Sequence, residues 1–309
     1  MNAGSRSETP ISVLVATRER PEDLFVCLRS LLAQDYGSYE IVVLDQSPSE
    51  ATEQAVRQAF GTPQRLRFLR SNTMGKSLAM NRLIEAACGT LLACTDDDTE
   101  VPPDWLTRIE AAFRQNPEED ILFGQVEASE AALAISDSRT PVISFPERRC
   151  VPLGEVAGMG ANMAMRREVG TRVGGFDALL GPGAPFCAAE EGDFVYRAQL
   201  GGARVFLEPS VTLVHRAWRT LEAWGCILYG YGIGDAAFAL KHVRCGDGRM
   251  ARLLAGRPAY MLARLCYRIL RRRFHEEEHY LRGYAQGIRR SLRYRVDRRT
   301  RLYQPQPGP

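Results

Sequence analysis

The stretch GTLLACTDDDTEVPPDWL (residues 89–106) runs from apolar residues of strand length straight into three consecutive aspartates. Two prolines follow, and apolar residues then recur at helical spacing from Trp105 onward. The sequence therefore predicts that the carboxylates of Asp96, Asp97 and Asp98 lie at the C-terminal end of a strand, which is the edge where open α/β sheets bind ligands. Adjacent carboxylates there can hold a hard divalent cation. The alternative is that Asp98 or Thr99 only caps the helix that follows.

The chain of 309 residues is 45% hydrophobic and 25% charged, which predicts a globular protein with one large domain or two smaller ones. Its eight cysteines form no C-x-x-C pair, and this favours reduced thiols and a cytoplasmic location over disulfides or a zinc site. Residues 1–10 are polar, lack the apolar core of a signal peptide and are expected to be flexible. No apolar run is long enough to predict a transmembrane span.

Apolar strand patterns alternate with amphipathic helix patterns up to the aspartate triplet. Strands are predicted at residues 11–16, 39–44 and 66–69 and before the triplet. Helices are predicted at residues 50–60 and 76–87 and in the amphipathic segment through Leu24, Leu28, Leu31 and Leu32. This alternation indicates an α/β fold with a mostly parallel central sheet and helices on both faces. Since parallel strands end at one edge, we expect Thr17, Arg18, Asp45 and the triplet to converge there.

Four of these segments together resemble family-2 glycosyltransferases: residues 11–21, residues 43–47, residues 75–81 and the aspartate triplet. The resemblance implies the Rossmann-like, A-type glycosyltransferase fold over residues 11–219, with a donor half at about 11–127 and an acceptor half at about 128–219. It also implies a nucleoside-diphosphate sugar as donor, with UDP-sugars favoured and GDP- or dTDP-sugars as alternatives. The residues implied around the donor nucleoside are Thr17, Arg18, Asp45, Lys76, Asp96 and Asp97.

The resemblance further implies a divalent metal, Mg²⁺ or Mn²⁺, on the donor diphosphate. Asp98 is the expected ligand together with Asp96. His215 lies near the end of the second of two predicted extended segments, 205–209 and 211–216, at a place where the family can have a ligating histidine. A nucleoside diphosphate leaves well only when its developing charge is neutralised, and a metal held by carboxylates does this. The alternative for His215 is a histidine that is simply hydrogen-bonded at a strand end.

The acceptor side of the family is matched by residues 158–167, which include Gly160 and Asn162, and by the sequence AEEGDFVYR at residues 189–197. The family usually has Glu-Asp-x-Asp in the second segment, so the residue that matches its catalytic base is Glu191, one methylene longer than aspartate. Asp193 and Glu190 are the less favoured candidates. Inverting transfer needs a base that takes the proton of the acceptor hydroxyl. The alternative is an acidic helix N-terminus without a catalytic role.

These features predict a metal-dependent, inverting glycosyltransferase that moves a sugar to a hydroxyl of a saccharide or lipid-linked acceptor, such as a precursor of a cell-surface polysaccharide. A nucleotidyltransferase is the second enzymatic hypothesis, although the loop after the first strand lacks the glycines of a phosphate-binding loop. A catalytically silent, membrane-associated scaffold with the same fold is the third.

The C-terminal part of the chain is strongly basic. Residues 241–309 carry 18 Lys and Arg against 5 Asp and Glu, whereas residues 1–240 carry 22 against 32. Helices are predicted over residues 220–300, and the glycine string at residues 229–234 indicates close helix packing or a bend. Residues 301–309 are expected to be disordered.

Arginines flank apolar stripes over residues 258–295, a pattern typical of helices that lie on an anionic membrane. The prediction is a peripheral protein on the inner face of the cell membrane. The alternatives are a solvated or oligomer-forming helix face. Binding of nucleic acid by this segment is disfavoured because no known nucleic-acid-binding module is recognised in the sequence.

Overall fold

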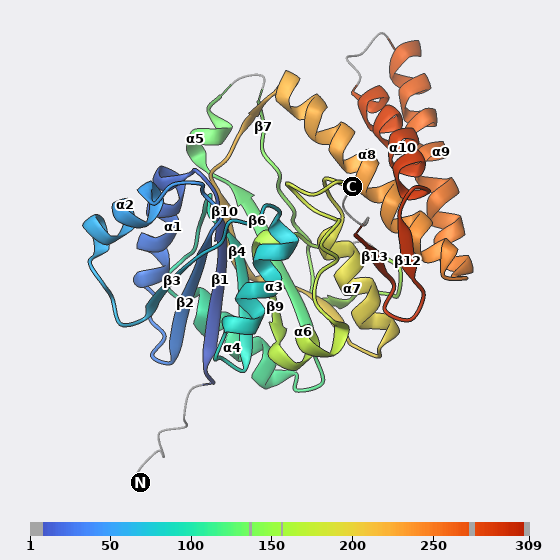
Figure 1. The fold of residues 1–309 in the computed structure, drawn as a ribbon. Coiled ribbons are helices and arrows are strands. Elements are labelled where there is room, and N and C mark those ends of the chain that lie inside the picture. Colours follow the sequence, from blue (N-terminus) through green and yellow to red (C-terminus); the bar gives the residue numbers. More distant parts are fainter. Residues whose placement is uncertain (1–8, 136–137, 156, 272–275, 306–309) are drawn as a thin grey trace.

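The computed structural model describes residues 9–135, 138–155, 157–271 and 276–305, and it shows a central sheet flanked by helices with a helical region at one side (Figure 1). The strands are β1 (Ile11–Thr17), β2 (Tyr39–Asp45), β3 (Leu66–Arg70), β4 (Leu91–Asp96), β5 (Thr99–Glu100), β6 (Ile121–Ala128), β7 (Ser138–Arg139), β8 (Arg149–Cys150), β9 (Met163–Arg166), β10 (Val205–His215), β11 (Arg219–Thr220), β12 (Arg295–Asp297) and β13 (Leu302–Gln304). The helices are α1 (Pro21–Leu32), α2 (Ala51–Phe60), α3 (Lys76–Ala86), α4 (Trp105–Gln115), α5 (Glu130–Leu133), the 3₁₀ helix η1 (Gly160–Asn162), α6 (Arg167–Val173), α7 (Glu190–Leu200), α8 (Leu221–Arg244), α9 (Gly248–Leu270) and α10 (Glu277–Ser291).

The main sheet of the described residues has the order β3-β2-β1-β4-β9-β6-β10-β5, and β8 pairs with β10. β1 is parallel to β2 and β4, and β6 is parallel to β10, whereas β9 is antiparallel to both of its neighbours. Successive side chains of β1 point to opposite faces. Val13 and Val15 pack in one apolar core with α1 and α4, and Leu14 packs in a second core with α3 and α7. The predicted α/β class and mostly parallel sheet are confirmed.

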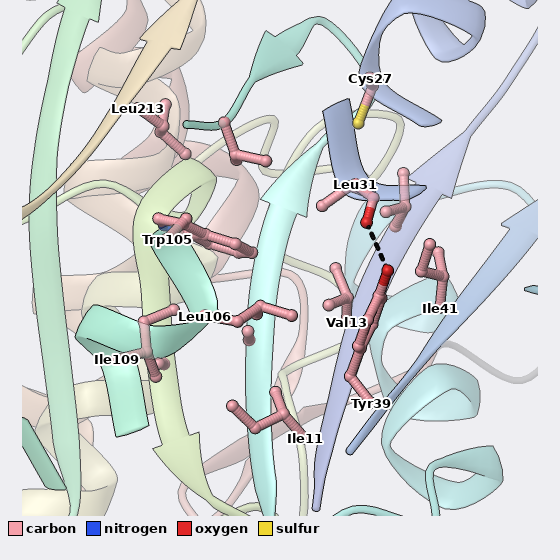
Figure 2. Close-up of a cluster of buried hydrophobic side chains, with 14 of the residues drawn as sticks. Ile11, Val13, Cys27, Leu31, Tyr39, Ile41, Trp105, Leu106, Ile109 and Leu213 are labelled. Atoms are coloured by element: carbon pink, nitrogen blue, oxygen red, sulfur yellow. Dashed lines mark hydrogen bonds between the residues drawn. The ribbon is translucent and has the colours of Figure 1, made fainter. Parts of the chain in front are cut away.

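Helix α4, which follows the aspartate triplet, is anchored by the first of these cores (Figure 2). Trp105, Leu106 and Ile109 are fully buried, as their helical spacing predicts. Burying such a side chain is worth about 1.5–3 kcal/mol, so one face of α4 binds firmly to the sheet. Across the same core the Tyr39 hydroxyl donates to the Leu31 carbonyl at 3.0 Å. The chain on the C-terminal side of the triplet is therefore fixed in place.

Asp96 is the last residue of β4, and Asp97 and Asp98 form the turn to the short strand β5. β5 pairs with the end of β10, which places Thr99 opposite His215. The sequence predicted two extended segments here, but the structure has one strand whose pairing with β6 shifts register between Glu208 and Thr212. Pro209 lies at this irregularity, because proline has no N–H for the sheet ladder. The continuous strand carries His215 to the triplet.

The predicted C-terminal helical appendage is formed by α8, α9 and α10, and glycines let α8 and α10 approach closely. A Cβ atom at Gly232 would lie 2.1 Å from the Tyr280 carbonyl oxygen, and one at Gly283 would lie 2.0 Å from the Tyr229 carbonyl oxygen. The interpretation of the glycine string as a packing element is confirmed, since residues 229–234 lie inside α8. Among the described residues, no helix is long and apolar enough to cross a membrane.

The expected disorder of residues 301–309 is wrong for the described part of this segment. β12 and β13 pair as a hairpin, and Tyr303 is only 4% exposed. Its hydroxyl donates to the Ala237 carbonyl at 2.7 Å, and its ring stacks on Phe186 with centroids 4.5 Å apart. Burial of this aromatic ring outweighs the entropy of ordering a short segment near a chain end. Residues 306–309, and residues 1–8 of the expected flexible N-terminus, lie outside the described residues.

Candidate active site

The ends of β1, β2 and β4 bring most of the predicted donor-side residues together, as expected for parallel strands. The Thr17 hydroxyl at the end of β1 donates to Asp97 Oδ2 at 2.7 Å. Arg18 is the exception, because its half-exposed guanidinium bonds only with Glu19, at 3.4 Å, among the contacts found in the described residues. The convergence of Thr17, Asp45 and the triplet at one sheet edge agrees with the sequence prediction.

Asp45 is fully buried at the end of β2, and only one of its two carboxylate oxygens accepts hydrogen bonds among the described residues. Its Oδ1 accepts from the Ser47 amide at 2.8 Å and from the Ser47 hydroxyl at 2.5 Å. Its Oδ2 is buried without a hydrogen-bond partner among the described residues. A buried acceptor that stays unsatisfied is costly, so this oxygen is poised to accept from an N–H group of a ligand.

Asp96, Asp98 and His215 form a cluster that fits a divalent metal. One ligating atom from each lies within 4.8 Å of the others, and His215 Nε2 lies 3.4 Å from Asp98 Oδ1. His215 Nδ1 is also buried without a hydrogen-bond partner among the described residues. Two carboxylates and an imidazole are a donor set that suits Mn²⁺ and accepts Mg²⁺. The pairing of β5 with β10 creates this cluster from segments more than a hundred residues apart.

Two cations flank the cluster. Arg20 Nη1 lies 2.8 Å from Asp97 Oδ1 and 3.0 Å from Asp98 Oδ2. Lys76, the first residue of α3, lies with its Nζ 2.7 Å from Asp96 Oδ1 and 3.7 Å from Glu191 Oε1. The sequence analysis did not name Arg20 as a site residue. Its position between the end of β1 and the start of α1 at Pro21 was the signal that could have placed it at the sheet edge.

Burial and these charges set the protonation of the site. Burial raises the pKa of the Asp97 carboxyl to about 7, against the opposing effect of Arg20. Burial also acts to raise the pKa of Asp96, but the adjacent Lys76 ammonium lowers it below the usual range. Burial disfavours charge on Lys76 as well, yet the carboxylates of Asp96 and Glu191 hold its pKa well above the usual range. Asp96 and Lys76 are therefore a charged pair.

Glu191 in the first turn of α7 faces this charged pair. Its side chain is 25% exposed, and Gly160 leaves the space that it occupies, since a Cβ atom there would lie 2.2 Å from Glu191 Oε1. Partial burial and the carboxylate of Glu191 raise the pKa of Tyr231 in α8, a nearby residue that sequence reasoning did not single out. Glu190 is buried, and burial together with Glu191 raises its pKa well above the usual range.

Two predicted site residues are engaged elsewhere. Asp193 is fully buried and accepts from Arg197 Nε at 2.8 Å, and it pairs with Lys241 and His242 on the side of α7 away from Glu191. Asn162 is buried, where its amide accepts from Trp105 Nε1 at 3.1 Å and donates to the carbonyls of Gln125 and Val211. The polar groups of both side chains are therefore engaged in contacts within the protein.

The match to a family model covers residues 12–173, more than half of the chain, and the family is described as glycosyl transferase family 2. A glucosyl-dolichyl phosphate glucuronosyltransferase of Haloferax volcanii is 28% identical over 276 residues, which are 82% of this chain and 85% of that protein. An uncharacterized glycosyltransferase of Escherichia coli is 32% identical over 123 residues, which are 40% of this chain and 35% of that protein.

Solved structures share the fold at low sequence identity. A mannosyltransferase from Pyrobaculum calidifontis, in complex with GDP-Man and Mn²⁺, is similar with a TM-score of 0.59 at 19% identity, covering 93% of this chain and 76% of that one. Residues 1–349 of TarS from S. aureus are similar with a TM-score of 0.55 at 18% identity, covering 80% of this chain and 69% of that one. From the match over residues 12–173, and with this fold around the aspartate cluster, the chain is a glycosyltransferase and belongs to glycosyl transferase family 2.

Proposed function

We propose that this glycosyltransferase is metal-dependent and inverting, and that it transfers a sugar from a nucleoside-diphosphate donor to an acceptor hydroxyl. The observation that carries the proposal is the cluster of Asp96, Asp98 and His215, beside which Lys76 pairs with both Asp96 and Glu191. One lysine thus contacts both the cluster that would hold the diphosphate and the carboxylate of Glu191.

The donor nucleoside lies at the ends of β1 and β2 in this proposal. The unpartnered Oδ2 of Asp45 accepts an N–H of the base, which uracil, thymine and guanine all offer. Asp97, held by Thr17 and Arg20, borders the ribose. Asp96, Asp98 and His215 would hold Mg²⁺ or Mn²⁺, which neutralises the charge that develops on the departing diphosphate. Lys76 adds a fixed positive charge at the same place.

Glu191 is the proposed base. Inverting transfer needs a carboxylate that takes the proton of the acceptor hydroxyl as its oxygen attacks the anomeric carbon. Glu191 is partly exposed and lies beside Lys76, whereas Glu190 is buried and Asp193 is committed to ion pairs, so neither neighbour is a better candidate. The extra methylene relative to aspartate is accommodated by the missing side chain of Gly160.

The proposed acceptor is a lipid-linked saccharide, with a free saccharide as the second candidate. Support comes from the H. volcanii relative, whose name describes glucuronosyl transfer to glucosyl-dolichyl phosphate and whose similarity spans 82% of this chain. The proposed donor is a UDP-sugar, and GDP- or dTDP-sugars are the alternatives. A saccharide attached to a lipid would place the enzyme at a membrane surface.

The solvent side of α9 is apolar over residues 259–270. Its exposed large side chains are Tyr260, Leu262, Tyr267, Ile269 and Leu270. This surface belongs to the basic segment of residues 241–309, although Arg264 and Arg268 are paired with Glu277 at 2.7 and 3.1 Å. We propose that the apolar side of α9 inserts shallowly into an anionic membrane, as amphipathic interfacial helices do, on the inner face of the cell membrane.

The donor site is tested by thermal stability and calorimetry. UDP-glucose, UDP-glucuronic acid, GDP-mannose and dTDP-glucose are compared with and without Mn²⁺, because a bound ligand raises Tm by mass action. Asp98→Ala should abolish the metal-dependent part of binding and leave the fold intact. Equal metal-dependent affinity in wild type and variant would refute the metal assignment.

The base is tested with the donor that gives the largest rise in Tm, by following nucleoside diphosphate release during transfer to water. Glu191→Gln keeps the size of the side chain but cannot accept a proton, so turnover should fall by roughly 10²-fold or more while donor Kd is unchanged. Asp193→Asn is the informative comparison, because loss of turnover only in that variant would show that the base has been assigned to the wrong carboxylate.

The membrane proposal is tested by sedimentation with anionic vesicles. Replacing Leu262 and Ile269 with Ser should weaken vesicle binding, whereas Leu133→Ser, at an exposed leucine outside this surface, should leave it unchanged. Raising the salt should weaken the binding of every variant, because screening acts on the basic segment. The membrane proposal is refuted if the wild type does not co-sediment with vesicles even at low salt. If the protein without vesicles is also an oligomer in analytical ultracentrifugation, α9 forms a protein interface instead.

A further inference from the structure

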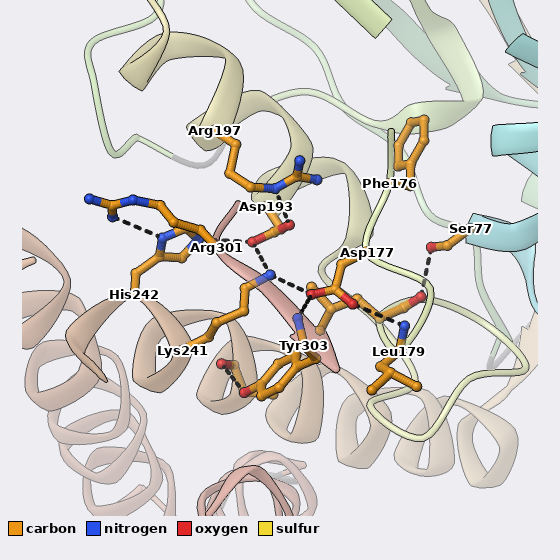
Figure 3. A network of polar contacts seen from close by, with 12 residues as sticks. Ser77, Phe176, Asp177, Leu179, Asp193, Arg197, Lys241, His242, Arg301 and Tyr303 are labelled. Carbon is orange, nitrogen blue, oxygen red and sulfur yellow. Dashed lines mark hydrogen bonds and ion pairs between the residues drawn. The ribbon is translucent and has the colours of Figure 1, made fainter. Parts of the chain in front are cut away.

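Lys241, near the end of α8, is fully buried and bridges two carboxylates (Figure 3). Its Nζ lies 2.6 Å from Asp177 Oδ2 and 2.6 Å from Asp193 Oδ1. Asp193 also accepts from Arg197, and its Oδ1 lies 2.8 Å from His242 Nε2. Burial acts to raise the pKa of Asp193, but Lys241 and Arg197 hold it far below the usual range, so the carboxylate is charged. The cluster is thus an ionic network in the interior.

The two carboxylates belong to the two segments that shape the acceptor side of the site. Asp193 lies in the first turn of α7, two residues after Glu191. Asp177 begins the loop of residues 177–188, whose far side contacts the donor-side helix α3. There the Lys76 amide donates to the Pro182 carbonyl at 3.0 Å, and the Ser77 hydroxyl donates to the Leu180 carbonyl at 2.7 Å. Lys241 therefore joins the helix of the proposed base to a loop that contacts Lys76.

The C-terminal hairpin closes the network from outside. The Tyr303 amide donates to Asp177 Oδ2 at 2.8 Å, and Arg301 Nη1 lies 3.3 Å from His242 Nδ1 and 3.1 Å from Asp247 Oδ2. The groups of this network named above thus come from α7, α8, the segment between α8 and α9, the loop of residues 177–188 and the C-terminal hairpin. All of them lie after residue 173, where the matched family segment ends.

The chain entering α7 is held in an unfavourable conformation. Cys187 and Ala189 have φ angles of +60° and +69°, a region that residues with a Cβ atom rarely adopt. Such conformations persist when the surroundings enforce them. Gly234 of α8 packs against this turn so closely that a Cβ atom would lie 2.6 Å from the Ala188 carbonyl carbon. Helix α8 thus contacts the turn directly through Gly234 and holds the following helix through Lys241.

Stability alone is a weak reason for this network. The attraction within a buried ion pair is largely offset by the cost of removing both charges from water, and apolar replacements of similar volume are often as stable. A lysine with two charged partners from different segments does, however, fix the relative position of those segments. A displacement of 1 Å at a catalytic group can cost about 10²-fold in rate.

We propose that Lys241, through Asp177 and Asp193, is a positioning residue that sets Glu191 relative to Lys76, and that the C-terminal region is therefore part of the catalytic unit. This inference rests on the proposed role of Glu191 as the base. Lys241 itself touches neither donor nor acceptor. Its removal should change turnover and leave the binding of the donor nucleotide, at the ends of β1 and β2, nearly unchanged.

The test uses Lys241→Met in the full chain, which removes the ammonium and keeps an unbranched side chain. Asp235→Asn is the matched control, since Asp235 also lies on α8 and pairs with Arg257 at 3.2 Å and with the Tyr280 hydroxyl at 2.7 Å, without contact to α7. Both variants lose an ion pair between helices. Three quantities are measured for each variant: Tm, the Kd of the donor nucleotide sugar with Mn²⁺, and kcat for nucleoside diphosphate release with UDP-glucose, UDP-glucuronic acid, GDP-mannose or dTDP-glucose.

We expect Lys241→Met to lower kcat about 10- to 100-fold with donor Kd within about threefold of wild type, and Asp235→Asn to lower Tm without changing kcat. If Lys241→Met lowers Tm and keeps wild-type kcat, the network is only structural and the proposal is wrong. Should Lys241→Met not fold, Asp193→Asn decides, because Lys241 keeps its pair with Asp177; unchanged kcat in that variant would overturn the proposal.

Glu191→Gln separates this inference from the function on which it rests. If Glu191→Gln keeps full turnover, the assignment of the base fails and the inference fails with it. If Glu191→Gln loses turnover while the folded Lys241→Met variant retains it, the base stands and only the positioning role of Lys241 is overturned.

Discussion

The contact between α8 and α10 gives a prediction in which one substitution has opposite effects at two sites. Gly283 of α10 meets the backbone of α8, where a Cβ atom would lie 2.0 Å from the Tyr229 carbonyl oxygen and 2.8 Å from its carbonyl carbon. Gly256 of α9 is exposed, and a Cβ atom there would meet nothing within 4 Å. Both glycines lie inside helices, so alanine improves helix propensity equally at both.

The expected magnitudes follow from these distances. Alanine in place of glycine in a helix interior stabilises by about 1 kcal/mol, which is the whole effect at Gly256. At Gly283 the clash is with backbone atoms that no side-chain rotation can relieve, so α10 must move away from α8. Overpacking of this kind costs about 3 kcal/mol, which leaves a net loss of roughly 2 kcal/mol. For a chain of this length 1 kcal/mol corresponds to about 2 °C in Tm.

Thermal unfolding of the two purified variants is the assay. Gly283→Ala should lower Tm by about 4 °C, and Gly256→Ala should raise it by about 2 °C. Gly283→Ala should also reduce protection from hydrogen exchange in α10, because its packing on α8 is loosened. If both variants gain stability, α8 and α10 do not approach as closely as these distances require, and the packing role of Gly283 is refuted.

Three further predictions concern the site. Gly160→Ala places a Cβ atom 2.2 Å from Glu191 Oε1, so it should lower kcat about 10-fold or more with donor Kd unchanged; equal kcat would argue against Glu191 as the base. Asp45→Asn presents an N–H group or a weaker acceptor to the base, so the donor Kd measured by calorimetry should rise about 10-fold or more, and an unchanged Kd would remove Asp45 from the donor site. The raised pKa of Glu190 means that its contribution to stability is present below the usual carboxyl pKa and is lost as pH rises through the folded value. Glu190→Gln mimics the neutral acid, so its Tm should exceed that of wild type at about pH 8 and match it near pH 4, and the same difference at both pH values would contradict this cause.

Local sequence patterns were sufficient for the fold class and for much of the donor side. Alternating apolar strands and amphipathic helices predict the parallel sheet, because each pattern records which side of an element faces the core. Since parallel strands end at one edge, the residues that follow them must converge, and Thr17, Asp45 and Asp96 do so. Arg18 shows the limit of this reasoning. Arg18 is half-exposed and contacts Glu19, whereas Arg20 from the same loop lies beside the carboxylates of the triplet.

Only the tertiary structure decided which of several similar side chains are free to act. Glu191 and Asp193 are two residues apart on one helix, so they point to different sides of it. The sequence cannot say which side meets Lys76 and which meets Lys241, because both lysines come from distant segments. The position of His215 beside the triplet also depends on tertiary structure, because the pairing of β5 with β10 brings it there. Residues 301–304 look disordered in sequence, but burial of Tyr303 holds them in place. Periodicity along the chain reports local environment, whereas the ionisation and the availability of a carboxylate depend on which distant groups exclude water from it.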